Sequence, residues 1–197
     1  MLIFKNDDKY IVFIHIPKNS GKYIRKKIES NKKNLIIKSY WNIKKNLDLA
    51  HIPYIKKDEY LEKNINYIFF AYSRNPYDRI VIAFLYKNKQ FINFAEEVKH
   101  KYFKYFVKNE LTRIKFLNNY DSNIIHYYPQ YLFVCDKNMK IENVKIYKIE
   151  DCEYSKKYNL KKYYDNECLK IINKLYENDF LSFGYEMFQS LSEIKER

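Results

Sequence analysis

The chain has very little glycine or proline, with 2 Gly and 4 Pro in 197 residues. This scarcity excludes collagen-like repeats and flexible Gly/Ser-rich linkers. The three cysteines, Cys135, Cys152 and Cys168, form no CxxC pair and no zinc-type spacing with histidine, so we expect reduced thiols in the core. No apolar run reaches the roughly 18 residues of a membrane span, and the N-terminus predicts no signal peptide or anchor. We therefore expect a cytoplasmic protein with no membrane span.

Hydrophobic residues make up 47% of the chain and aromatic residues 19%, which is enough for a packed core. No internal repeat and no linker-like stretch divides the sequence, so we expect a single domain over residues 1–197. The formal net charge is +13. That sign favours an anionic ligand or partner. However, nearly all the basic residues are Lys, and Asn, Ile and Tyr are also abundant, a bias that AT-rich codons produce; specific cations must therefore be identified by position.

Short apolar runs alternate with stretches of helical spacing. The runs predict strands at 10–15, 35–38, 67–72, 131–134 and 144–149. The helical spacing predicts helices at 22–30, from Pro76 onward, at 91–108 and around 169–176. This interleaving favours an α/β fold with a mainly parallel central sheet and flanking helices in three layers.

The first buried run is followed by a basic turn, Lys18 to Gly21, and then by a helix. Such a turn can wrap backbone N–H groups around a phosphate, and the helix N-terminus adds positive potential. Lys18 and Lys22 supply cations. The turn is not a Walker A loop, because Ile16 stands where the first glycine is required and Tyr23 where the magnesium-binding Ser/Thr is required.

The segment Phe13 to Tyr23 resembles the 5′-phosphosulfate loop of carbohydrate sulfotransferases that use 3′-phosphoadenosine 5′-phosphosulfate (PAPS), roughly F-I-H-I-P-K-T-G-G-T-S. Residues 13–18 and Gly21 match that pattern. Asn19, Ser20, Lys22 and Tyr23 replace Thr, Gly, Thr and Ser.

A second segment, 69–86, follows the run at 67–72 and resembles the 3′-phosphate motif of the same family, F-V-R-N-P-Y-D-R-L-V-S-A-Y. Residues 74–79, Val81 and Ala83 match, whereas Ile82 replaces the family's phosphate-binding Ser. Arginine offers a planar fork for phosphate oxygens, and it is rare in this Lys-rich chain. Weaker likenesses follow at 126–130 (H-x-x-P-Q), 146–150 and 176–185, in the family's order.

The resemblance implies a P-loop-NTPase-like sulfotransferase fold, PAPS as sulfuryl donor, no metal, and a hydroxyl acceptor, most simply on a glycan. It implies that Lys18 stabilises the leaving oxygen and that His51 is the base, with His126 as the alternative. It assigns cofactor binding to the following residues: Lys18, Asn19, Ser20, Gly21, Lys22, Tyr23 and Arg74. We expect His15 to be structural and Arg79 to pair within the fold.

Two other functions compete with this one, while a small-molecule phosphotransferase is disfavoured because the Walker A residues are missing. The first is a non-catalytic descendant of the sulfotransferase fold that binds a nucleotide or another anion, because Ile82 and the altered loop remove hydroxyl groups. The second is a basic nucleic-acid-binding protein, suggested by the charge and the aromatic content; the sequence shows no recognised nucleic-acid-binding motif, so no specific nucleic acid is expected.

Overall fold

The computed structural model describes residues 1–31, 35–38, 43–44, 47–91, 93–116, 120–153 and 155–195. The chain divides into two compact units, each made of two stretches of sequence: unit 1 is Met1–Ser73 with Leu117–Ser155, and unit 2 is Arg74–Phe116 with Lys156–Arg197. The prediction of a single domain over 1–197 stays a prediction. Within the described residues, no helix is both long enough and apolar enough to span a bilayer.

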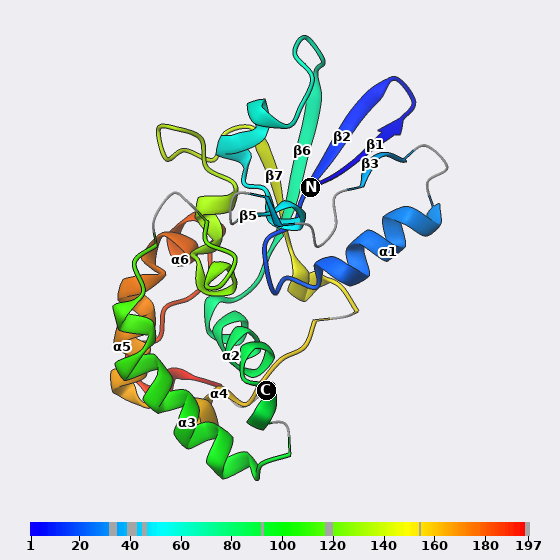
Figure 1. Ribbon diagram of the computed structural model, residues 1–197. Helices are drawn as coiled ribbons and strands as arrows, with labels where there is room; N and C mark the ends of the chain where they lie inside the picture. Colours follow the sequence, from blue (N-terminus) through cyan, green and yellow to red (C-terminus); the bar gives the residue numbers. More distant parts are fainter. Residues whose placement is uncertain are drawn as a thin grey trace. The chain divides into compact units, whose positions relative to one another are not determined.

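Unit 1 is built on a five-stranded sheet of order β3-β1-β2-β6-β7 (Figure 1). Its strands are β1 (Leu2–Asn6), β2 (Lys9–Ile14), β3 (Leu35–Lys38), β6 (Tyr67–Ser73) and β7 (Val144–Lys148). β2 pairs in parallel with β6 and β6 with β7, while β1 is antiparallel to β2 and to β3. Four strands therefore run in one direction, which confirms the α/β class and the mainly parallel sheet. The three-layer arrangement and the sulfotransferase fold stay predictions.

The remaining elements of unit 1 are a helix, a short hairpin and several 3-10 turns. Helix α1 spans Gly21–Asn31, and the hairpin joins β4 (Ile43–Lys44) to β5 (Leu47–Asp48). Part of the core is a cluster in which β1, β2, α1 and the 3-10 turn after β7 (Ile149–Asp151) meet, formed by Leu2, Phe13, Ile24 and Ile149.

Unit 2 is helical. Its helices are α2 (Pro76–Lys87), α3 (Glu96–Asn109), α4 (Leu160–Tyr163), α5 (Asn166–Leu175) and α6 (Glu177–Phe183). α3 packs against α4 and α5, and α5 contacts α6 (Figure 1). Local sequence sets several helix ends: the Asn75 side chain accepts from the Tyr77 N–H with Pro76 in the first turn, and the Asp165 side chain accepts from the Cys168 N–H.

Two sequence predictions of local structure were wrong, and one strand was missed. The predicted strand 131–134 is a 3-10 helix, Gln130–Phe133, because a four-residue apolar run fits a buried turn as well as a strand. Helix α3 begins at Glu96 rather than near Phe91. Strand β1 was not predicted, although it forms a hairpin with β2 around Asp7, whose φ is 52°.

Candidate functional site

The turn between β2 and α1 has an unusual backbone. Lys18 and Ser20 have φ angles of 69° and 56°, whereas Asn19 between them does not have a positive φ. Each left-handed non-glycine residue costs on the order of 1 kcal/mol, so the surrounding contacts must hold this conformation. Alternation of positive and negative φ is typical of the backbone nests that bind anions, so the turn is a candidate anion site. Lys18 is half-buried and Lys22 is exposed.

Gly21 starts α1, and it is needed because His15 lies against it. A Cβ atom at Gly21 would be 1.7 Å from His15 Nε2, closer than any real contact. Gly21 does not have a positive φ, so close packing rather than backbone freedom requires glycine here. From the sequence we expected Gly21 to let the backbone approach a phosphate. In the structure, the space beside Gly21 is filled by the His15 ring.

Asn19 holds the turn from within. Its Nδ2 donates to the Tyr72 carbonyl at 2.5 Å and to Gln130 Oε1 at 2.7 Å. Asn19 is 2% exposed and Gln130 is fully buried. The Asn19 side chain is therefore a brace between the turn, the end of β6 and the 126–130 segment.

Tyr23 also points inward. It packs against the core cluster of unit 1 and lines a cavity of 450 Å³ together with Phe70 and Cys152. Tyr23 stands where the family's phosphosulfate loop has a phosphate-binding Ser. In this structure its ring instead packs on the apolar side of α1.

Three histidines gather beside this turn. The ring centroids of His15 and His51 are 4.3 Å apart, and those of His51 and His126 are 5.9 Å apart. Arg25 donates from Nε to His15 Nδ1 at 3.2 Å and from Nη2 to the Ala50 carbonyl at 2.9 Å. The sequence analysis did not single out Arg25, although the scarcity of arginine that drew attention to Arg74 applies equally to it.

The tautomer of His51 follows from its hydrogen bond. Nδ1 lies 2.7 Å from the His15 carbonyl oxygen, which can only accept, so Nδ1 carries the proton and Nε2 carries the lone pair. Nε2 is 3.9 Å from the Asp48 carboxylate. Burial lowers the pKa of His51 to about 3, although the bond to the His15 carbonyl opposes this shift. His51 is therefore neutral at physiological pH.

His15 has the same electrostatic setting. Burial first, and then the nearby His51 and Arg25, hold its pKa well below the usual value. Its ring is 4% exposed and accepts a hydrogen bond from Arg25, so the expectation of a structural histidine agrees with its environment.

These two histidines make stability depend on pH. Both stay neutral in the folded protein, whereas in the unfolded chain they bind protons as pH falls through about 6.5. The free energy of unfolding should therefore fall by about 1 kcal/mol per histidine between pH 6.5 and 5.5. Urea unfolding at pH 7.5, 6.5 and 5.5 measures this loss. His51→Gln should roughly halve the dependence, and a wild-type free energy that is constant over this range would contradict the argument.

Arg74 opens the other predicted motif, in unit 2. Arg74 is 2% exposed, and its Nη1 donates to the Lys156 carbonyl at 2.8 Å. Asp78, four residues on, accepts from the Tyr158 N–H at 3.0 Å. The start of α2 thus holds the backbone of the segment that begins at Lys156.

Arg79 lies inside unit 2, next to the second predicted motif, as expected for a structural residue. It is fully buried, and burial lowers its pKa, while the buried carboxylate of Asp179 on α6 opposes that shift. Ile82, which replaces the family's phosphate-binding Ser, is half-buried and lines a cavity in the same unit.

The comparisons with known proteins do not identify a family: no family model matches the chain, and no curated protein and no solved structure is detectably similar to it. Within the part of the chain that the structure describes, no group of three or more His, Cys, Asp or Glu side chains is arranged to hold a metal ion.

Proposed function

We propose that this protein is a PAPS-dependent sulfotransferase that transfers a sulfuryl group to a hydroxyl acceptor, most simply on a glycan. The observation that supports it best is the position of Asn19. Its amide joins the turn that resembles the phosphosulfate loop to the end of β6 and to Gln130, which ends the H-x-x-P-Q segment. Segments that resemble one family, and that lie up to 111 positions apart, are thus packed together in unit 1.

The residues of the turn fit a phosphate-bearing ligand. The alternation of φ along Lys18, Asn19 and Ser20 is typical of anion-binding nests, and the half-buried Lys18 adds a positive charge. A bound PAPS would supply the sulfuryl group and carry its two nucleotide phosphates. In this proposal the turn holds the 5′ side and Arg74 holds the 3′-phosphate by a charge-assisted bond.

Two side chains would act on the reaction itself. His51 accepts the acceptor's hydroxyl proton at Nε2, the nitrogen that carries the lone pair. The acceptor oxygen then forms a bond to sulfur while the bond from sulfur to the bridging phosphate oxygen breaks. Lys18 stabilises the negative charge that develops on that leaving oxygen, so its contribution grows toward the transition state.

The second candidate is a non-catalytic protein of the same fold that binds a nucleotide or another anion. Two observations favour it. The pKa of His51, about 3, makes it a weak base, and both His51 and Arg74 are only 2% exposed. The two candidates differ in one outcome: only the first transfers a sulfuryl group, whereas the second leaves the nucleotide or anion that it binds unchanged.

Adenosine 3′,5′-bisphosphate should stabilise the protein far more than AMP, because only the bisphosphate carries a 3′-phosphate for Arg74. A ligand that binds the native state at a hundredfold excess over Kd adds about 2.7 kcal/mol to the free energy of unfolding. The measurement is the shift in melting temperature with each nucleotide. Arg74→Lys should reduce the difference between the two nucleotides, whereas Arg113→Lys, on the exposed Arg113, is the control. Equal shifts from AMP and the bisphosphate would rule out a 3′-phosphate site.

A further inference from the structure

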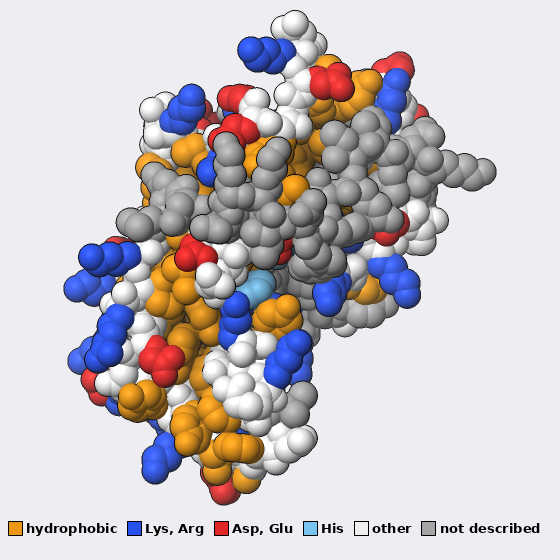
Figure 2. All heavy atoms as spheres, viewed as in Figure 1, with side chains coloured by type: hydrophobic (Ala, Val, Ile, Leu, Met, Phe, Trp, Pro, Cys, Tyr) orange, Lys and Arg blue, Asp and Glu red, His pale blue; other side chains and the backbone are white. Residues whose placement is uncertain are grey.

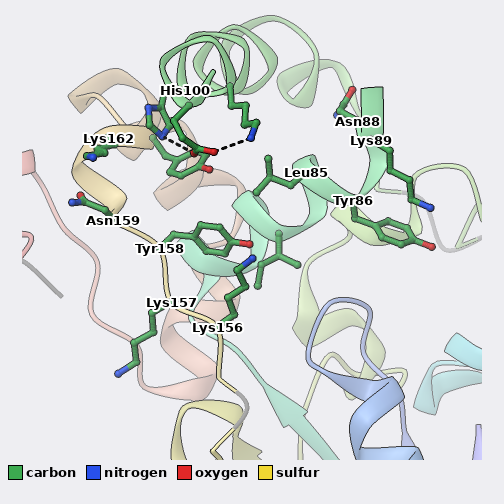
Figure 3. A pocket seen from close by; sticks show the side chains of 14 residues that line it. Leu85, Tyr86, Asn88, Lys89, His100, Lys156, Lys157, Tyr158, Asn159 and Lys162 are labelled. Atoms are coloured by element: carbon green, nitrogen blue, oxygen red, sulfur yellow. Dashed lines mark hydrogen bonds and ion pairs between the residues drawn. The ribbon is translucent and has the colours of Figure 1, made fainter. Parts of the chain in front are cut away.

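A cavity of 760 Å³ lies within unit 2, between the second half of α2, the first turns of α3 and the segment 156–163. Figure 3 shows it with Tyr158 directed toward Leu85 at its centre and Lys162 and Lys89 on opposite sides. A volume of this size accommodates a ligand as large as a nucleotide. The residues predicted from the phosphosulfate loop all belong to unit 1, so this cavity is not made of them.

The lining of this cavity is strongly positive. It contains one carboxylate, Glu96, and five lysines: Lys89, Lys99, Lys156, Lys157 and Lys162. Glu96 is already paired with Lys99, at 2.8 Å. In the part of the chain that the structure describes, no ion pair joins any of the other four lysines to a carboxylate.

The abundance of lysine in the sequence does not by itself explain this charge. Three other cavities provide a comparison, and all three lie in unit 1. Two of them are lined by two lysines and two carboxylates each, and the third by one lysine and two carboxylates. On the face drawn in Figure 2, Lys and Arg side chains are dispersed among acidic and apolar ones. A net of four positive charges around one cavity is therefore a local feature.

Aromatic rings accompany the cations. Lys156 Nζ lies 5.0 Å from the centroid of the Tyr158 ring, and Lys89 Nζ lies 5.2 Å from that of Tyr86. Ile82 and Leu85 supply apolar surface between these two pairs. Anchored ammonium groups suit phosphate oxygens, and flat apolar surface suits a planar base.

The start of α2 holds the backbone of the segment 156–158, which lines the cavity. Arg74 donates to the Lys156 carbonyl, and Asp78 accepts from the Tyr158 N–H. On the opposite side, the His100 ring packs against Tyr163, with the ring centroids 4.5 Å apart. The segment that carries three of the lysines is thus fixed in place before any ligand binds, which reduces the ordering cost of binding.

We propose that this cavity is a binding site for a nucleotide that carries at least two negative charges on its phosphates. The lysines contact the phosphates, and the side of the cavity that carries Tyr158 contacts the base. The proposal does not depend on sulfuryl transfer, because such a ligand would bind here whether or not the protein is an enzyme. Other phosphate-bearing ligands share part of this chemistry, and titrations with pyrophosphate and with adenosine distinguish a nucleotide from a ligand bound through its phosphates alone.

The test is calorimetric titration of the whole protein at 0.15 M salt, where long-range attraction between exposed charges is screened. The probes are ATP, adenosine 3′,5′-bisphosphate, adenosine and inorganic pyrophosphate. We expect both nucleotides to bind at least tenfold more tightly than adenosine or pyrophosphate, because only they offer the base and the phosphates together. Pyrophosphate binding as tightly as ATP would overturn the nucleotide assignment, and adenosine binding as tightly would overturn the role of the lysines.

Two matched variants test whether the ligand binds in this cavity. Lys162→Gln should raise the Kd of ATP about tenfold, the loss typical of a hydrogen bond to a charged group. Lys161→Gln removes the same charge from the neighbouring, exposed residue of α4, which does not line the cavity, and should change Kd less than twofold. Equal effects from the two variants would indicate diffuse attraction, as for a nucleic acid, and would overturn the proposal.

Lys18→Ala distinguishes this site from the proposed sulfotransferase site. If Lys18→Ala abolishes nucleotide binding and Lys162→Gln leaves it intact, the nucleotide binds at the turn after β2, and the cavity proposal fails while the sulfotransferase proposal survives. If Lys162→Gln weakens ATP and the bisphosphate equally and Lys18→Ala changes neither, the cavity proposal holds and the sulfotransferase proposal loses its cofactor.

Discussion

Replacing Gly21 by alanine should lower the free energy of unfolding by roughly 3 kcal/mol, the upper part of the range for overpacking a buried site. The added Cβ would lie 1.7 Å from His15 Nε2, and both residues are buried. The His15 ring has little freedom to move, because it accepts from Arg25 and stacks on Phe13. Urea unfolding of Gly21→Ala and the wild type measures the loss.

The double variant His15→Ala/Gly21→Ala tests the cause. If the clash is responsible, the two substitutions together should cost clearly less than the sum of the single ones. Gly184→Ala is the matched control for backbone strain, because Gly184 has a φ of 62° at the end of α6 and should lose about 1 kcal/mol for that reason alone. A loss below about 0.5 kcal/mol for Gly21→Ala would contradict the packing of His15 against Gly21.

His51→Ala should lower turnover by roughly 10²–10⁴-fold if His51 is the base of a sulfotransferase. Its pKa of about 3 changes the pH profile that an ordinary histidine would produce. An unperturbed base would make activity rise with pH through about 6.5. His51 is neutral throughout the range from pH 5.5 to 8. Its titration should therefore cause no change in the rate between these two pH values.

The assay requires an acceptor, so a panel of glycans, phenols and peptides must first be screened with labelled PAPS. His126→Ala should cost less than His51→Ala and should act mainly on the acceptor's KM; Lys161→Gln, at an exposed residue outside both proposed sites, is the control. If His51→Ala keeps its turnover and His126→Ala loses it, the base is His126. If PAPS binds and no acceptor in the panel is sulfated, the non-catalytic protein is the better description.

The strands of the sheet could be predicted where burial makes a run of residues apolar. β2 and β6 pair in parallel and carry the near-continuous apolar sequences that such strands require. Helix α2 could be predicted because Asn75 and Pro76 form a local start signal. The 131–134 run failed this test, because four apolar residues satisfy a 3-10 turn equally well.

The candidate site could be predicted only in part. The sequence identified the turn after β2 and the arginine after β6, because both depend on residues that are neighbours in the chain. It did not show that Asn19 points inward, because its partner Gln130 is 111 residues away. It also did not show that the base candidate, His51, is buried with a pKa of about 3.

The sequence by itself therefore determined the α/β class, the strand–turn–helix with Lys18 and the start of α2, since each follows from local patterning and capping. Only the tertiary structure determined which side chains meet. Packing sets His15 against Gly21, and the contacts of α2, α3 and α4 bring Lys89, Lys99 and Lys162 around one cavity. Side-chain contacts between distant positions leave no periodic pattern in the sequence. The sequence therefore does not distinguish the lysines that line the cavity from the other lysines of the chain.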